Sequence, residues 1–232
     1  MRLDGWEGTW QGNHYNNPSS REYLAITTSL LEQQSKNQKF LDVGTCEGFY
    51  VIHMARKGHW GLGVDLNKKF IKKAREQAKK FNIWNAHFIV ASGDALPFKN
   101  AWFDITLSAE TLEHVKEDKH ATFLRELVRV TRKEVILVIP TLKWGKYFKL
   151  VDAVHASFSH KDICALVKKN CLEVRKIYAV NIAPIPLKIK KYLPSFITKF
   201  QYIIDFSIGK IFPFNFLGCN TVSVCIPKHK GE

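Results

Sequence analysis

The sequence lacks several features that would narrow its function at once. It has no CxxC pair, no zinc-type cysteine spacing and no internal repeat. Its five cysteines, an odd number, provide neither a disulfide framework nor a metal centre. No uncharged apolar run reaches the length of about 18 residues that spans a membrane, and no secretion signal precedes the first expected helix. These absences predict a metal-free protein of the reducing cytoplasm. The cysteines are Cys46, Cys164, Cys171, Cys219 and Cys225.

Acidic residues are also scarce. The chain has 21 Asp and Glu against 35 Lys and Arg, which gives a formal charge of +14. Such a charge favours anionic partners, namely nucleic acid, an acidic membrane face or phosphorylated substrates, without choosing among them. A lysine-rich solvated surface explains it equally well. The 232 residues, 46% hydrophobic and 24% charged, suit one globular domain with a full core.

Short apolar runs alternate with helical patterns along most of the chain, which is typical of parallel βαβ units with helices on both faces of a sheet. The expected strands span residues 39–44, 60–66, 86–91, 103–109, 134–140, 172–180 and 220–227. The expected helices span residues 18–35, 48–57, 67–81, 117–131 and 159–169. Before the last strand, residues 181–218 break the alternation with four prolines, eight aromatic residues and five lysines. The sequence therefore predicts a seven-stranded α/β sheet with a long insertion in its final connection.

The segment most informative about chemistry lies at the end of the first expected strand. Asp42 ends the apolar run, Gly44 begins a turn and Gly48 opens the next helix, which places a helix N-terminus beneath an adenosine cofactor. A dinucleotide fingerprint needs a second glycine so that the backbone can approach a pyrophosphate. Here that position is Cys46, with Glu47 beside it. The loop is therefore better suited to a cofactor that has no phosphate and carries a positive charge.

Further segments follow in a regular order. Asp65 ends the second strand about 20 residues beyond the glycine turn, the distance at which an acidic residue meets a ribose. Gly93-Asp94-Ala95 follows the third strand. Leu96-Pro97-Phe98 and Trp102-Phe103-Asp104 precede the fourth strand, and Ser108–His114 ends it. Taken singly, the first acid could cap the next helix and the second could hold a turn.

Together these motifs resemble those of the class I S-adenosylmethionine-dependent methyltransferases, in particular the small, single-domain members of the type 11 group. The resemblance covers residues 38–180 and 220–227. It implies a Rossmann-like, mostly parallel sheet of seven strands and S-adenosylmethionine as the cofactor. One carboxylate is expected to accept hydrogen bonds from the ribose hydroxyls, and another is expected to lie against the adenine amino group. The cofactor-binding residues it implies are Asp42, Gly44, Thr45, Cys46, Gly48, Asp65, Leu66, Asp94, Ala95 and Glu110.

We expect the whole chain to form one methyltransferase domain. Its parts are an N-terminal aromatic segment and helix (1–37), the cofactor-binding core (38–180), an insertion or lid (181–218) and the last strand with a tail (219–232).

Methyl transfer from a sulfonium requires a nucleophile aligned about 3–3.5 Å from the methyl group and protected from water. A general base is needed only when that nucleophile arrives protonated. Glu110 and His114 are the catalytic candidates, because open α/β sheets bind ligands at the carboxyl ends of their strands. His114 could instead pack in the strand-to-helix turn, and Glu110 could border the cofactor. His155 and His160 could face the substrate, although a surface loop explains both.

Two segments bear on the acceptor. Trp6, Trp10 and Tyr15 lie in a terminal region that folds over the cofactor in similar enzymes, where aromatic rings attract a sulfonium; packing on the sheet edge is the alternative. Residues 181–218 combine aromatic residues with lysines, which suits a lid or contact with an anionic membrane.

The expected acceptor is a small or lipid-like molecule. RNA is the alternative that the charge supports, although Ser108–Thr111 lacks the motif of nucleobase amino methylation. A non-catalytic interaction module is a third reading, resting on Cys46 alone. The expected location is cytoplasmic, with peripheral membrane contact as an option, and the oligomeric state stays open.

Overall fold

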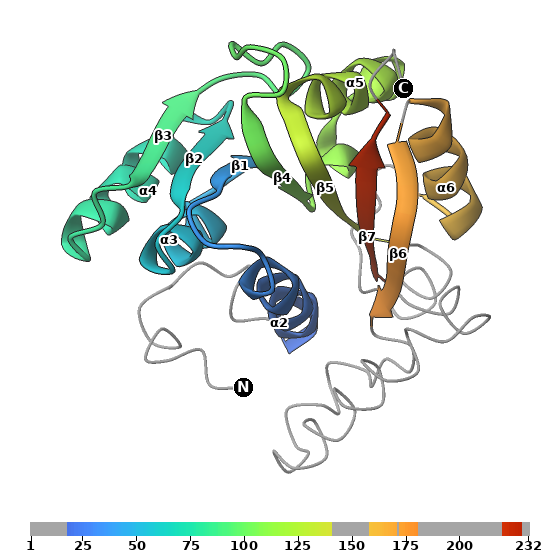
Figure 1. The fold of residues 1–232 in the computed structure, drawn as a ribbon. Coiled ribbons are helices and arrows are strands. Elements are labelled where there is room, and N and C mark those ends of the chain that lie inside the picture. Colours follow the sequence, from blue (N-terminus) through green and yellow to red (C-terminus); the bar gives the residue numbers. More distant parts are fainter. Residues whose placement is uncertain (1–17, 141–157, 171, 181–219, 229–232) are drawn as a thin grey trace.

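A central sheet organises the computed structural model, which describes residues 18–140, 158–170, 172–180 and 220–228 (Figure 1). The seven strands follow the order β3-β2-β1-β4-β5-β7-β6. Their bounds are β1 Lys39–Val43, β2 Trp60–Asp65, β3 Ala86–Val90, β4 Phe103–Ala109, β5 Thr131–Pro140, β6 Leu172–Val180 and β7 Asn220–Pro227. The α-helices are α2 Pro18–Glu32, α3 Phe49–Arg56, α4 Lys68–Lys80, α5 His120–Val130 and α6 His160–Lys169, and short 3₁₀ helices span η1 Leu112–His114 and η2 Glu117–Lys119.

The sheet is mostly parallel, as the alternation of strands and helices predicts. Strands β1 to β5 pair in parallel, and only β7 runs antiparallel to its neighbours β5 and β6. The order reverses at β1, which lies between β2 and β4. Open α/β sheets bind ligands at such a reversal, outside the carboxyl ends of the strands. The topology thus directs attention to the loops that follow β1 and β4.

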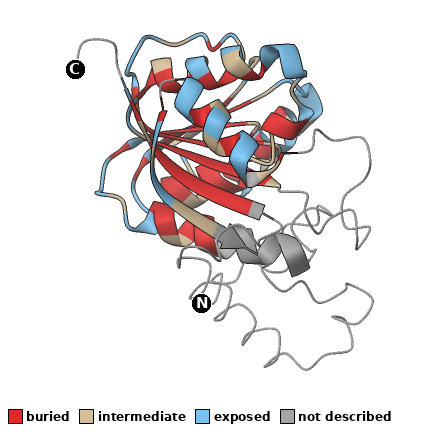
Figure 2. Ribbon diagram, turned by 90° about the vertical axis from the view of Figure 1, so that its right-hand side faces the viewer, coloured by how far each residue is buried: buried red, intermediate tan, exposed pale blue. Residues whose placement is uncertain are grey.

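Helices cover both faces of the sheet. One apolar core joins α2, α3 and α4 to side chains such as Phe40 and Ile105. The other joins α5 and α6 to the alternate residues, among them Leu41 and Phe103. Figure 2 shows the result, with buried strands inside and exposed residues on the outer sides of the helices. Burial on both faces explains why the central strands read as continuous apolar runs.

Local signals set the helix ends. Asn67 caps α4 by accepting the Lys69 N–H at 2.9 Å, and Ser159 with Asp162 forms the capping box expected before α6. The helix expected over residues 117–131 is shorter, because its first turn is the 3₁₀ helix η2. The chain passes directly from α5 into β5, so that strand begins three residues earlier than the apolar pattern indicates.

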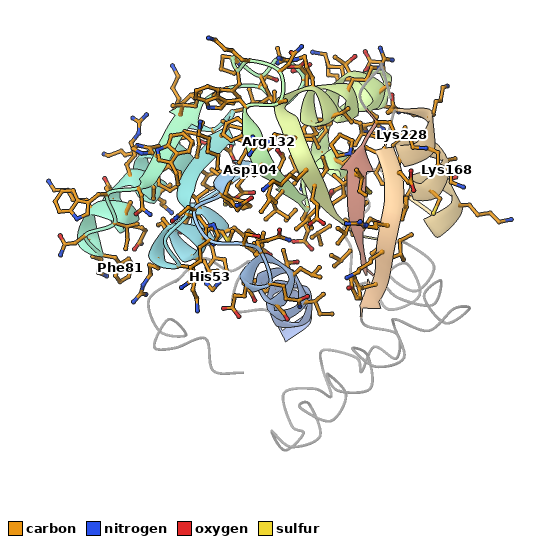
Figure 3. All side chains as sticks on the ribbon, viewed as in Figure 1. His53, Phe81, Asp104, Arg132, Lys168 and Lys228 are labelled. Carbon is orange, nitrogen blue, oxygen red and sulfur yellow. The ribbon has the colours of Figure 1, made fainter. Side chains whose placement is uncertain are left out.

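Polar contacts hold the amino ends of the central strands. Asp104, at the start of β4, accepts the Lys39 N–H at 2.9 Å and pairs with Arg132 of β5 (Figure 3). Burial raises the pKa of the Asp104 carboxyl, but the hydrogen bonds and positive charges around it lower the pKa by more. The pKa therefore lies below its usual value. This ion pair fastens three neighbouring strands at the edge opposite the candidate site.

Several expectations concern residues outside the described part of the chain. They are Trp6, Trp10, Tyr15, His155 and the insertion 181–218. Within the described residues, no helix is both long and apolar enough to cross a bilayer.

Candidate active site

The candidate site lies at the carboxyl edge of the sheet, where the loops after β1, β2, β3 and β4 meet. Pairing places Val43 beside Val64 and Asp65 beside Val90, so the first three strands end side by side. On the other side of β1, Asp42 pairs with Leu107 of β4. Residues separated by more than sixty positions in the sequence therefore share one edge.

The turn after β1 has the left-handed backbone that glycine favours. Gly44 has a φ of 81° and Gly48 a φ of 85°. A side chain would not fit at either position: a Cβ on Gly44 would collide with Thr111, and one on Gly48 would lie 2.5 Å from the Phe88 ring. The amide of Gly44 also donates to the Val64 carbonyl at 2.9 Å. The two glycines thus let the turn close against β2, β3 and the loop after β4.

Cys46 takes the place of the missing second glycine and adopts its conformation. Its φ of 51° is left-handed, a state that costs a residue with a side chain about 1–2 kcal/mol. Its N–H donates to Asp65 Oδ2 at 2.9 Å. Burial raises the pKa of the thiol to about 11, and nearby carboxylates add to the rise. Cys46 is therefore a neutral thiol that supports the turn through its backbone.

Asp65 is oriented by two backbone donors. While Oδ2 accepts from Cys46, Oδ1 accepts the Asn67 N–H at 2.8 Å. The side chain that caps α4 is that of Asn67, so Asp65 is not the helix cap. A carboxylate oxygen has more than one acceptor site, which leaves Asp65 able to bind hydroxyl groups as well. The carboxylate is fixed before any ligand arrives.

Asp42 is a buried acid behind this turn, with 2% of its surface exposed. Burial raises its pKa to about 7, Asp65 adds to the rise, and Thr45 partly offsets it. Tyr50 of α3 is buried nearby; burial raises the pKa of its phenol well above the usual value, and the charges of Asp42 and Glu110 contribute. Asp42 therefore holds a proton for part of the time near neutral pH.

A second buried carboxyl follows β4. Glu113 is 5% exposed in the 3₁₀ helix η1, and its Oε2 has no hydrogen-bond partner among the described residues. Burial raises its pKa to about 8, with the charge of Glu110 adding to the rise. Glu110 itself has a φ of 48°, and its N–H donates to the Val138 carbonyl at 2.8 Å. His114 is exposed at the end of the same turn.

Sequence reasoning named Glu110 and His114 but missed Glu113 and Tyr50. The available signal was the apolar neighbour Leu112, which is 1% exposed and draws the 3₁₀ turn inward. Only the tight turn reveals that Glu113 is buried together with Leu112, whereas His114 is exposed and Glu110 is half-buried.

Asp94 lies in the loop that follows β3, four residues after its last residue, Val90. It pairs with Lys119 Nζ at 2.5 Å and bonds to the Ser92 hydroxyl. These two hydrogen bonds, that of Lys119 first, lower the pKa of the Asp94 carboxyl. The amide of Ala95 donates to the Ser92 carbonyl at 3.2 Å, so this segment is also a closed turn. Leu66, after β2, is 70% exposed at the same edge.

This geometry agrees with comparisons to known proteins. Residues 41–139 match the family described as the methyltransferase domain. A ubiquinone biosynthesis O-methyltransferase of Pelagibacter ubique is 36% identical over 162 residues, which cover 63% of this chain and 66% of that protein. Residues 41–139 therefore form a methyltransferase domain, and the chain has the fold of the class I S-adenosylmethionine-dependent methyltransferases.

Another relative matches over a shorter segment. A chloroplastic tocopherol O-methyltransferase of Arabidopsis thaliana is 32% identical over 112 residues, covering 47% of this chain and 32% of that protein. The chain thus spans less than two thirds of these relatives. A solved protein of Pyrococcus horikoshii superposes with a TM-score of 0.69 at 15% identity, covering 98% of this chain and 97% of the other. Magnesium protoporphyrin IX methyltransferase of Synechocystis, solved with bound SAH, gives a TM-score of 0.66 at 13% identity, covering 95% and 90%.

The residues of the methyltransferase fit the cofactor that its family implies. Its described site edge presents carboxyl groups, two of which, Asp42 and Glu113, are raised in pKa by burial and by neighbouring acids. A cationic ligand relieves such an arrangement, whereas a pyrophosphate would worsen it. Among the residues with described positions, no three His, Cys, Asp or Glu are placed to bind a metal.

Proposed function

We propose that the protein transfers a methyl group from S-adenosylmethionine to a small or lipid-like acceptor. The observation that carries this proposal is the group of carboxyl side chains at the carboxyl edge of the sheet, because it suits a ligand with a sulfonium and an ammonium group. The bound cofactor would supply the methyl group on a positively charged sulfur.

In this proposal, Asp65 binds the ribose hydroxyls. Two backbone N–H groups already fix its carboxylate, so little conformational entropy is lost when the hydroxyls bind. The turn from Gly44 to Gly48 holds the methionine part, with Thr45 and Cys46 along it. Asp94, beside the exposed Leu66 and Ala95, faces the adenine amino group, and Lys119 keeps it ionised.

In this proposal, side chains of the turn after β4 accept the proton that the acceptor molecule loses. Glu110 and His114 remain the candidates named from the sequence, and the buried Glu113, whose pKa is raised to about 8, is coupled to Glu110 through its charge. A phenol or hydroxyl loses its proton as the carbon–oxygen bond forms, so a base in contact with it assists the reaction. Because Glu113 lies inside the turn, we assign direct contact with the acceptor to Glu110 and His114.

The acceptor class is supported by two relatives whose names specify ubiquinone biosynthesis and tocopherol as the setting of O-methylation. Both names specify methylation at oxygen in a small-molecule setting. RNA is less well supported, because acidic side chains at the site edge repel phosphates.

Calorimetric titration with S-adenosylmethionine and its demethylated product tests the proposal. We expect micromolar binding of both ligands to the wild type and a loss of at least tenfold in Asp65→Ala, since two hydroxyl contacts to a charged group disappear. Asp118→Ala is the matched control: it removes an exposed aspartate of η2, and binding should not change.

Labelled methyl donor then tests the acceptor. Catechol- and quinol-type compounds should be methylated by the wild type, and Glu110→Gln should lower kcat. Absence of binding by either ligand to a folded wild type would refute the methyltransferase assignment. Binding with methylation of RNA but no small molecule would refute the acceptor class alone.

A further inference from the structure

The positive charge of the chain is unevenly placed in the described structure. The carboxyl edge of the sheet carries acids such as Asp65, Asp94 and Glu110. The amino edge is different: its principal acid, Asp104, is neutralised by Arg132 and Lys133. The carboxyl edge also carries lysines, but Lys73 pairs there with Glu47 and Lys119 with Asp94. The amino edge adds the exposed lysines Lys79 and Lys80 at the end of α4.

Exposed tryptophans gather at the same amino edge. Trp60 begins β2, Trp84 lies two residues before β3, and Trp102 immediately precedes β4. Their exposed fractions are 36%, 85% and 44%, and together they form the majority of the large exposed apolar residues in the described part of the chain. Single exposed apolar residues are ordinary, but a group of the largest ones marks an interaction surface.

Contacts between neighbouring strands connect Trp60, Trp84, Trp102 and Lys39. Together with Lys79 and Lys80 of α4, these residues form a surface that we call the tryptophan edge. Lys39 pairs in register with Trp60, and its Nζ lies 3.8 Å from the centre of the Trp102 ring. Gly61, which follows Trp60, donates its N–H at 2.8 Å to the carbonyl of Asn85, which follows Trp84.

Helix α4 brings additional positive charge to the tryptophan edge. It runs from the carboxyl edge back to the amino edge, where it ends with the exposed pair Lys79 and Lys80, four residues before Trp84 (Figure 1). The apolar face of α4 is buried through Ile71, Ala74 and Ala78. The helix therefore offers only its charged side to a partner, and the tryptophans supply the apolar contact.

We propose that the tryptophan edge docks onto an anionic phospholipid bilayer. Tryptophan prefers the boundary between lipid headgroups and acyl chains, and lysine attracts acidic headgroups while its stem lies along apolar surface. Docking in this manner leaves the carboxyl edge turned toward the aqueous phase.

The chemistry of the edge favours lipid over nucleic acid. Arginine recognises phosphate groups through two parallel hydrogen bonds, but the arginines here are occupied: Arg132 pairs with Asp104, and Arg129 pairs with Glu126 at 2.6 Å. Base stacking needs an open ring face, whereas Lys39 already covers one face of Trp102.

Vesicle cosedimentation tests the proposal. The probes are vesicles of phosphatidylcholine alone and of phosphatidylcholine mixed with phosphatidylglycerol, at low and high salt. The full chain should bind only the mixed vesicles, and high salt should release it. Each lysine near such a surface contributes about fivefold, so Lys79→Glu with Lys80→Glu should weaken binding by at least about 25-fold.

Matched variants separate this edge from the total charge. Lys68→Glu with Lys69→Glu makes the same change in the first turn of the same helix, at the opposite edge, and should retain vesicle binding. Trp84→Ala should weaken binding about tenfold, whereas Val90→Ala, which shortens an exposed side chain at the carboxyl edge, should not. Thermal unfolding confirms that each variant folds.

Four results would overturn the proposal. The first is equal binding to neutral vesicles, and the second is an equal loss of binding in both lysine pairs. The third is unchanged binding in all edge variants. The fourth is failure of the folded protein to bind the mixed vesicles, including the case in which single-stranded RNA or a second copy of the chain binds this edge instead. None of them bears on cofactor binding, so the methyltransferase proposal is tested independently.

Discussion

Glu113→Gln isolates the energetic consequence of a carboxyl group buried without a partner. The carboxyl has a pKa of about 8 in the folded protein against an ordinary value of 4.5. Between these values the folded state holds a proton that the unfolded chain has released, so the stability of the wild type falls as the pH rises. Glutamine has nearly the same shape and does not titrate.

The magnitude follows from the pKa difference. One pKa unit corresponds to 1.36 kcal/mol, so the ionised form of Glu113 is disfavoured in the fold by up to about 5 kcal/mol. The free energy of unfolding of Glu113→Gln minus that of the wild type should therefore rise by about 1.4 kcal/mol per pH unit from about pH 5 to about pH 8. Any cost of burying the amide group adds a constant and leaves this slope unchanged.

Urea unfolding, followed by circular dichroism at several pH values, measures the difference. Asp42, with its raised pKa, and His53 and His59, whose pKa values are lowered by burial, also make stability depend on pH. They are present in both proteins, so their contributions cancel in the subtraction. Glu117→Gln makes the same substitution at an exposed position of η2, before α5, and serves as the control. A flat or falling difference for Glu113→Gln would refute the burial argument.

Three further outcomes concern the site. Gly44→Ala should lower the free energy of unfolding by at least about 2 kcal/mol, because a left-handed residue gains a Cβ that meets Thr111; an unchanged urea midpoint would contradict this. Cys46→Gly should relieve backbone strain, offset in part by glycine's greater chain entropy, and raise the melting temperature by up to about 3 °C, measured by calorimetry; a loss of stability would show that the thiol packs more than it strains. Binding of S-adenosylmethionine near pH 7 should release more protons than binding of its demethylated product, because the sulfonium lowers the pKa values of neighbouring carboxyls such as Asp42; titrations in buffers of different ionisation enthalpy measure this, and equal release would count against a sulfonium beside these acids.

Much of the fold could be predicted because its signals are local. Apolar runs bounded by glycine and polar residues located all seven strands, and the capping pair Ser159 and Asp162 located the start of α6. The predicted element boundaries that were wrong depend on contacts with neighbouring elements. Strand β5 begins at Thr131 because it continues the α5 backbone and pairs with Phe103 of β4, which the apolar pattern does not record.

The candidate site divides in the same way. Asp42, Gly44, Gly48, Asp65 and Asp94 belong to motifs of fixed spacing, and the structure brings them to one edge of the sheet. Which role each performs stays a prediction. The contacts of these residues could not be predicted from the sequence. Lys119 pairs with Asp94 across 25 positions of sequence, and Tyr50 lies near the site because of the way its helix packs.

The sequence by itself determined the alternation of strands and helices, the glycine turn and the positions of the acids, since each of these depends on residues close together in the chain. Tertiary structure alone decided which acids lose contact with water, and therefore which carboxyls, Asp42 and Glu113, hold protons near neutral pH. It also gathered three tryptophans, spaced along the chain, onto one basic edge. Burial and charge density arise from elements that meet only after folding, and for this reason no local pattern encodes them.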